Sequence, residues 1–308
     1  MKWLSMVGAL ALVSLRLLAQ TEAPAGGLQE KPQHDREFWR AITKNRYAVP
    51  EGQPVFPLLR ELSGYLGSRD PELRDDLAYT ITAVWIKHQK QISTHELNSL
   101  LEMWRANLRT DAGESGPDGV FNRSFSALCL AALAERDLKE PFLTAERYQS
   151  LLTDALAYLR DERDLRGFDP TLGWIHATAH TADLLGALAS NPLLARKDQR
   201  RLLDAISERL SSAHEIFTFG EQDRLALVAA RIVERKDFDR SGFEAWLTAM
   251  DGADQRVWND SPPHLGLLQT FENDSYMLRG LATYLGMNPS DPAVSEAQNA
   301  VLKVLKGR

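Results

Sequence analysis

Two histidines and an aspartate share one helical spacing in the middle of the chain. His176 and His180 lie four residues apart, and Asp183 follows three residues later. On a helix these three side chains fall on one face. Two imidazoles one turn apart can chelate a divalent ion such as zinc, with a carboxylate as third ligand or as the group that orients a ligand. The first hypothesis is therefore a metal site made by His176, His180 and Asp183.

The histidine pair has two other interpretations. The glutamate that follows the first histidine in the His-Glu-x-x-His metalloproteases is absent here, since Ala177 stands in that place. Both rings are equally well explained as neutral, hydrogen-bonded side chains packed between helices, and a polar pocket without metal is the third interpretation. The residues alone do not choose among the three.

Two further polar blocks lie elsewhere in the chain. Arg123 and Ser124 follow the glycine-rich segment 113–119, which could place an anion on the first amides of a helix. An ion pair of Arg123 with an acid such as Glu162 or Asp164 is the interpretation we prefer. The second block, 221–224, begins a helix with two acids that favour the helix dipole, and it could supply a metal ligand or base if the fold brings it to His176.

The candidate pocket combines these blocks with the segment around the histidines. Its residues are Arg123, Ser124, Glu162, Asp164, Arg166, Trp174, His176, His180, Glu221, Asp223 and Arg224.

Composition limits the functions that these residues can serve. The chain has 308 residues, 44% of them apolar and 25% charged, which suits a globular protein with a sizeable core. Its net charge of −6 repels phosphate backbones, so we expect no nucleic-acid partner. Cys129 is the single cysteine, which excludes an intrachain disulfide, and its apolar surroundings predict a buried, inert thiol.

The N-terminal residues resemble a signal peptide. Lys2 precedes the apolar stretch 3–15, which is too short for a transmembrane helix. Cleavage after Ala19 or Ala25 would release a periplasmic or secreted protein with no stable membrane span, and an uncleaved anchor is the alternative. We expect a signal over residues 1–25, a linker over 26–34, and a single all-helical domain over 35–308.

The elements that must position the candidate site are predicted to be helices, because apolar residues recur at intervals of three and four. Caps mark several starts: Asp70-Pro71-Glu72 opens a helix to about Ile86, and Ser93 with Glu96 forms a capping box. Other helices are expected at 57–67, 97–108, 145–160, 172–189, 197–210, 222–235, 242–250, 265–284 and 291–306. The segment 66–74 resembles the turn of a HEAT repeat. These features predict stacked antiparallel hairpins in a HEAT-like α-α superhelix, with an α/α toroid as the alternative.

Several of these motifs together resemble the uncharacterised bacterial family DUF2785. The resemblance covers about residues 58–235. Its motifs here are the segments 70–75, Glu114 with 123–126, 158–167, 173–185 and 221–224. It implies an all-helical fold and a bacterial origin, but no activity. Because polar motifs from separate helices carry it, the resemblance also implies that they share a pocket.

Two functions follow as hypotheses. The one we favour is a binding module whose polar pocket takes a peptide, a glycan or a small molecule. The alternative is a metal-dependent hydrolase that uses His176 and His180, and a metal-free acid/base enzyme using Glu162 and Asp164 is a weaker third.

Overall fold

The computed structural model describes residues 33–110, 118–259, 261–288 and 290–308. Internal contacts divide the chain into two units, Met1–Lys31 and Pro32–Arg308, and the described residues all lie in the second. The predicted signal peptide, nearly all of the linker and most of the glycine-rich loop, Glu114 included, lie outside the described residues.

The described part of the chain is all-α, which confirms the predicted class. Its helices are α1 (Arg36–Lys44), α2 (Val55–Ser63), the π-helix η1 (Glu72–Tyr79), α3 (Thr80–His88), α4 (Thr94–Arg109), α5 (Gly119–Asp137), α6 (Ala145–Asp161), α7 (Ala177–Ser190), α8 (Arg196–Ser212), α9 (Glu221–Val233), α10 (Arg240–Asp254), the 3₁₀-helix η2 (Gln255–Asn259), α11 (Leu265–Gly286) and α12 (Pro292–Lys306). A short antiparallel pair, β1 (Phe168–Asp169) and β2 (Gly173–Trp174), joins α6 to α7.

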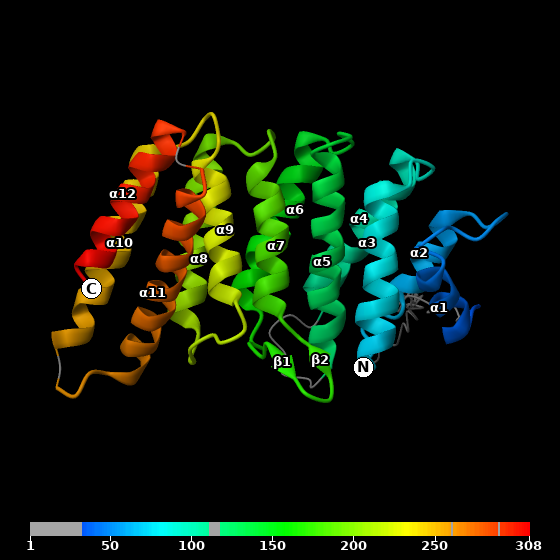
Figure 1. Ribbon diagram of the computed structural model, residues 1–308, viewed down its shortest axis with the longest axis horizontal. Coiled ribbons are helices and arrows are strands. Elements are labelled where there is room, and N and C mark those ends of the chain that lie inside the picture. Colours follow the sequence, from blue (N-terminus) through cyan, green and yellow to red (C-terminus); the bar gives the residue numbers. More distant parts are fainter. Residues whose placement is uncertain (1–32, 111–117, 260, 289) are drawn as a thin grey trace, which may run out of the picture. The chain divides into compact units, whose positions relative to one another are not determined.

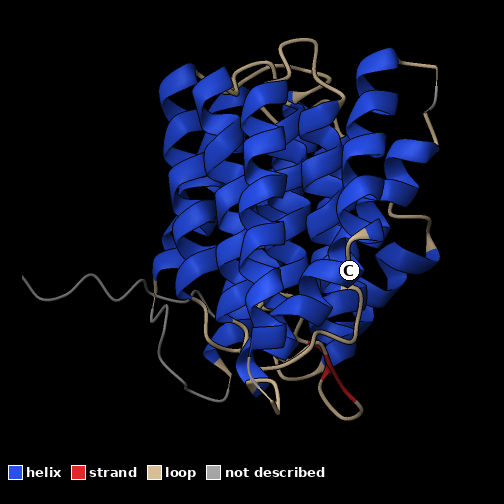
Figure 2. Ribbon diagram, turned by 90° about the vertical axis from the view of Figure 1, so that its left-hand side faces the viewer, coloured by secondary structure: helices blue, strands red, loops and turns tan. Residues whose placement is uncertain are grey.

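The helices from α3 to α11 pack in two rows. Along the front row in Figure 1, α3, α5, α7, α9 and α11 each contact the next, while α4, α6, α8 and α10 form the row behind. Consecutive helices cross from one row to the other, so each pair is a hairpin of the expected kind. Figure 2 shows the same helices from the side, with the β-hairpin at one end of the bundle. The finer assignment as a HEAT-like superhelix or a toroid stays a prediction.

Local capping explains where many helices begin. Ser93 and Glu96 form the predicted capping box. The Asp70 carboxylate accepts the amides of Glu72 and Leu73 at the start of η1, as an N-cap should. These bonds join residues that are two or three positions apart, so the capping motifs can be predicted from the sequence alone.

The centre of the core is formed by α5 and α7, whose residues are mostly buried. Small side chains on α5 allow close approach to its neighbours, so polar groups such as Ser124 lie at 0% exposure. Cys129 is also at 0% exposure, as predicted, and burial raises the pKa of its thiol.

The predicted helix from Leu172 to Ala189 is wrong at its start, because α7 begins at Ala177. Backbone bonds from Ile175 N to Gly167 O (2.9 Å) and from His176 N to Arg166 O (3.1 Å) hold the preceding chain as an extended hairpin. His176 itself has φ 51° and ψ 33°, a left-handed conformation outside the helix. The two histidines therefore do not lie on one helix face.

No helix in the described part of the chain combines the length and the apolarity that a bilayer-spanning segment needs.

Candidate functional site

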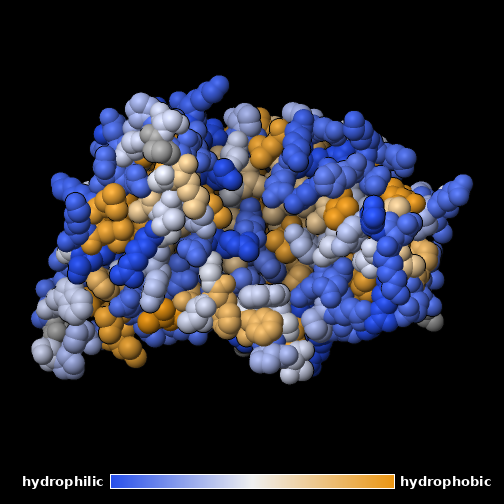
Figure 3. Space-filling model, in the orientation of Figure 1, coloured by the Kyte–Doolittle hydropathy of each residue, from blue (hydrophilic) through white to orange (hydrophobic). Residues whose placement is uncertain are grey.

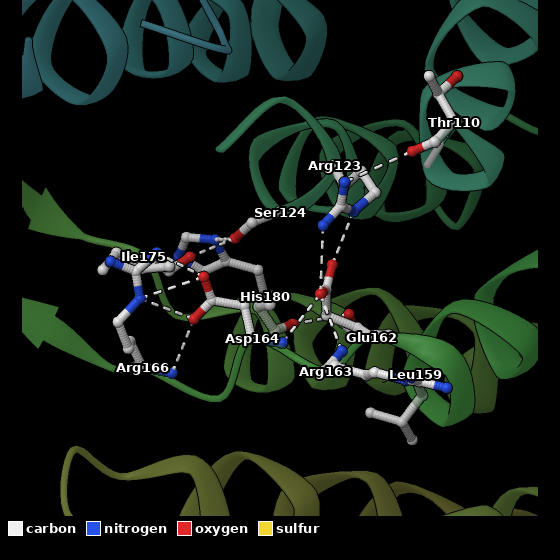
Figure 4. A network of polar contacts seen from close by, with 12 residues as sticks. Thr110, Arg123, Ser124, Leu159, Glu162, Arg163, Asp164, Arg166, Ile175 and His180 are labelled. Carbon is white, nitrogen blue, oxygen red and sulfur yellow. Dashed lines mark hydrogen bonds and ion pairs between the residues drawn. The ribbon is translucent and has the colours of Figure 1, made fainter. Parts of the chain in front are cut away.

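The segment between α6 and α7 brings most of the candidate residues together. After α6 ends at Asp161, residues 162–176 run along the ends of α5, α7 and α9 and include the hairpin. Figure 4 shows the side chains from α5 that meet this segment. We call residues 166–176 the connecting hairpin.

A buried arginine from η1 holds the connecting hairpin in place. Arg74, at 0% exposure, donates to the carbonyls of Leu172 (2.7 Å) and Trp174 (3.1 Å). Its guanidinium lies over the Phe121 ring at 4.1 Å and pairs with Asp75 at 2.6 Å. Burial raises the pKa of Asp75 to about 6, against the pull of Arg74. Arg74 is thus a structural anchor, which the sequence analysis did not select.

Arg123 and Glu162 form the ion pair that we preferred at the sequence level, and the structure confirms it. Nε of Arg123 lies 2.7 Å from Glu162 Oε2, and Nη2 lies 3.2 Å from Oε1. The same carboxylate accepts the amides of Arg163 and Asp164, as Figure 4 shows. Burial acts to lower the pKa of Arg123, but Glu162 outweighs it and raises that pKa. The two side chains bind each other and thereby hold the end of α6 to α5.

Ser124 and His180 form a second buried pair, also visible in Figure 4. Ser124 Oγ lies 2.5 Å from the Ile175 carbonyl oxygen and 2.8 Å from His180 Nδ1. The hydroxyl has one proton, and the carbonyl can only accept, so Ser124 donates to Ile175 and accepts from His180. His180 is therefore the tautomer with its proton on Nδ1.

This assignment excludes Ser124 as a nucleophile activated by His180. A catalytic serine must give its proton to the imidazole, whereas here the imidazole donates to the serine. Burial, followed by the charges of His176 and Arg224, lowers the pKa of His180 well below its usual value. Its ring is neutral, and Nε2 keeps a lone pair that meets no hydrogen-bond donor within the described ranges.

His176 is held by the loop before α9. Its Nε2 donates to the Phe219 carbonyl at 3.0 Å and lies 3.4 Å from a carboxylate oxygen of Glu221. The ring stacks on Trp174, with centroids 4.8 Å apart, and meets His180 edge-on at 5.6 Å. Glu221 also accepts the Phe219 amide at 2.9 Å, so its place at the start of α9 is structural as well as electrostatic.

Asp183 and Arg224 form a partly exposed ion pair beside the histidines. Nη1 of Arg224 lies 2.6 and 2.5 Å from the two carboxylate oxygens, and the side chains are 44% and 23% exposed. Burial raises the pKa of Asp183, although Arg224 acts to lower it. The Tyr79 ring packs on Phe125, which contacts His180. Asp183 acts to raise the pKa of Tyr79 and Arg224 acts to lower it.

We call this group the imidazole site. It consists of Tyr79, His176, His180, Asp183 and Arg224, contributed by η1, α7 with its N-cap, and α9. Figure 3 shows hydrophilic residues gathered in a recess over the middle of the face formed by the front row. Two hollows found by geometry lie elsewhere, between α2 and α4 and between α4 and α6, and include none of these residues.

The predicted metal ligands do not form a ligand set. His180 and His176 each donate from one ring nitrogen, to Ser124 and Phe219, which leaves one nitrogen of each ring, but the expected third ligand Asp183 is bound at both oxygens by Arg224. Across the described ranges, no three His, Cys, Asp or Glu side chains are arranged to hold a metal ion. The donor set does not fit zinc.

The remaining candidates are more peripheral. Asp164 pairs with Arg166 at 2.5 Å at the edge of the connecting hairpin. Asp223 is exposed on α9 and lies against Gly280 of α11, where an added Cβ would be 2.6 Å from its carboxylate. Neither pair reaches the imidazole rings by a direct contact among the described residues.

Two exposed aromatic residues were missed by the sequence analysis. Phe168 and Phe219 are 41% and 45% exposed and lie beside Trp174, which is 42% exposed. Ring centroids are 5.0 Å apart for Phe168 and Trp174 and 6.3 Å for Trp174 and Phe219. Phe168 follows Gly167 and Phe219 precedes Gly220. These neighbouring glycines are the sequence signal that each phenylalanine lies in a loop.

The fold and site define an all-helical protein with a buried polar cluster and an aromatic edge. Residues 108–282 match the family model described as protein of unknown function (DUF2785). This match spans more than half of the chain, so the chain belongs to that family, as its motifs indicate. No curated protein matches the chain.

Proposed function

We propose that this protein is a binding module and that its ligand binds at the imidazole site. The observation that carries the proposal is the state of His180. One ring nitrogen is fixed by Ser124, while Nε2 keeps an unshared lone pair next to the partly exposed Asp183–Arg224 pair. Nε2 is not among the buried side-chain atoms that lack a partner in the described part of the chain, so it is open to solvent and to a ligand that donates a hydrogen bond.

The surroundings support binding in preference to metal-assisted hydrolysis. A metal hydrolase needs three protein ligands and an open position, and the third ligand predicted here, Asp183, is bound at both oxygens by Arg224. An acid/base enzyme built on Glu162 and Asp164 is equally disfavoured, because Glu162 is 5% exposed and bonded to Arg123 while Asp164 is paired with Arg166.

A variant that removes only the free acceptor tests the proposal. In His180→Asn the amide can still donate to Ser124, but no group replaces Nε2. Thermal-shift screening against neutral oligosaccharides, dipeptides and small metabolites should give a compound that raises the Tm of the natural protein and not that of His180→Asn. The exposed-site variant His95→Asn is the control and should respond as the natural protein does. If every stabilising compound acts equally on His180→Asn, the imidazole site is not the binding site.

We also propose export, on the basis of the N-terminal segment alone. Expression in a bacterium followed by intact mass measurement of the periplasmic fraction tests it. A mass that corresponds to a new N-terminus after Ala19 or Ala25 supports export, and full-length protein in the cytoplasmic fraction contradicts it.

A further inference from the structure

The aromatic edge beside the imidazole site is a surface with a definite form. Phe168, Trp174 and Phe219, which we call the aromatic ledge, expose 41–45% of their area, although large apolar side chains normally avoid water when they lie in contact with one another. Trp174 meets Phe168 at an interplanar angle of 64° and Phe219 at 87°. The rings therefore support one another edge-on, and ring surface is left open to solvent.

The ledge is held rigidly in the absence of a ligand. Arg74 binds the carbonyls on either side of Gly173, which has φ +74° and lies so close to Pro71 that an added Cβ would be 2.9 Å from its Cβ. At Gly167 an added Cβ would lie 2.3 Å from the Phe219 ring, so the two loops interlock. A surface that is already ordered loses little conformational entropy on binding.

The charged side chains next to the ledge already have partners within the protein: Asp169 and Glu221 accept backbone amides, and the others form ion pairs. Asp164 pairs with Arg166 and Asp183 with Arg224. Burial keeps His180 neutral by lowering its pKa. A charged ligand would therefore have to compete with ion pairs already formed, at a desolvation cost. The arrangement favours an uncharged ligand that has both apolar and hydrogen-bonding surface.

The ledge and the imidazole site are continuous. Trp174 stacks on His176, and His176 contacts the ring of His180. His176 covers one face of the Trp174 ring, so a molecule on the open face reaches His180 Nε2 only if it extends past the His176 ring, as a chain of several sugars does. A sugar ring fits both surfaces, because its C–H face packs on an aromatic ring while its hydroxyl groups donate to acceptors.

We propose that the ligand is a neutral oligosaccharide, one sugar of which stacks on Trp174 while a neighbouring hydroxyl donates to His180 Nε2. This proposal rests on the proposed function and names the ligand class of that site. In this proposal the aromatic ledge provides the stacking contact and the imidazole site provides the hydrogen-bond acceptor.

Isothermal titration with neutral hexasaccharides tests the proposal. The probes are cellohexaose, maltohexaose, xylohexaose, mannohexaose and N-acetylchitohexaose, with hexagalacturonate as the charged counterpart. We expect saturable binding of at least one neutral probe and a loss of at least tenfold in affinity in Trp174→Ala. Trp258→Ala is the matched control, because Trp258 is an exposed tryptophan (56%) packed on Phe271, away from the ledge, and should bind as the natural protein does.

The outcomes separate the two proposals. If no neutral probe binds, or if Trp174→Ala and Trp258→Ala bind equally well, the oligosaccharide proposal is overturned. Tighter binding of hexagalacturonate than of every neutral probe also overturns the oligosaccharide proposal. The same holds if vesicles of neutral phospholipid bind in a Trp174-dependent way and no neutral sugar binds. A different ligand whose binding is lost in His180→Asn leaves the proposed function standing. Neutral sugar binding that depends on Trp174 but not on His180 contradicts the imidazole site.

Discussion

The Arg123 guanidinium and the Glu162 carboxylate meet through two bonds while their side chains are only 3% and 4% exposed. They are 39 residues apart in the chain and join the start of α5 to the end of α6. Two charges withdrawn from water in this way depend on each other, because either one alone would be buried without a counter-charge.

Arg123→Met should therefore lower the free energy of unfolding by about 3–5 kcal/mol, measured by urea denaturation. The matched control is Arg200→Met, which removes one partner of an exposed pair on α8 and should change stability by less than about 1 kcal/mol. Equal effects of the two substitutions would contradict the structural role of the buried pair.

Ser124→Ala should destabilise the protein by roughly 2–4 kcal/mol, since it leaves both the Ile175 carbonyl and the His180 Nδ1–H without a partner. Ser126→Ala on the same buried helix is the control. It removes only an acceptor for Asn107, which also reaches Asn122, so about 1 kcal/mol is expected. Urea unfolding of both variants measures the difference, and a smaller loss for Ser124→Ala would refute the shared-hydroxyl arrangement.

His180 should make stability fall as the pH drops. Burial lowers its pKa in the folded state, so below about pH 6.5 the unfolded chain takes up a proton that the folded chain does not. The stability of the natural protein relative to His180→Asn should then fall by up to about 1.4 kcal/mol per pH unit between pH 6.5 and 5. Unfolding curves at pH 7.5, 6 and 5 measure this, and a constant difference would show that His180 titrates normally.

A buried acid pair near the end of the chain should act in the opposite direction. Asp254 and Asp274 lie together at 2% and 4% exposure; Arg308 pairs with Asp254, while its charge acts on Asp274 without a direct bond. Burial raises the pKa of Asp254 to about 6 and that of Asp274 well above its usual value. Both groups thus stabilise the fold at low pH; the contribution of Asp254 is lost as the pH rises through about 6, and that of Asp274 as the pH rises through its own raised pKa.

Asp274→Asn should reduce that loss, because it removes one of the two acids with a raised pKa and the charge that acts on the other. Between pH 5 and 8 we expect the variant to lose less stability than the natural protein, by on the order of 2 kcal/mol. Asp204→Asn, at an exposed pair on α8, provides the comparison and should follow the natural protein. Parallel pH profiles for all three proteins would argue against a raised pKa at Asp274.

Arg74→Lys tests the anchoring of the connecting hairpin. Lysine keeps the charge beside Asp75 but lacks the planar fork that reaches the Leu172 and Trp174 carbonyls. The amides of Ile175 and His176, which close the hairpin, should exchange with deuterium faster than in the natural protein. Arg69→Lys, at a largely exposed arginine, should leave their exchange unchanged. Identical exchange in both variants would show that other contacts hold the hairpin.

The sequence by itself determined the helices and many of their limits. The capping box at Ser93 and the N-cap at Asp70 act within three residues, and the apolar periodicity marks the buried face of each helix. Motifs also predicted that polar residues from separate helices would meet. Such signals are local or repetitive, so they do not depend on how the chain closes.

Only the tertiary structure decided what those polar residues do. Phe219 holds His176, Arg74 holds the hairpin that displaces the start of α7, and Ser124 accepts from His180. These partners lie 43 to 100 residues away along the chain. The aromatic ledge likewise joins two loops, because Phe219 lies 45 residues after Trp174 and 51 after Phe168. Long-range contacts override helical spacing here. Leaving a buried polar group without a hydrogen-bond partner costs more free energy than one additional helical turn gains from local propensity.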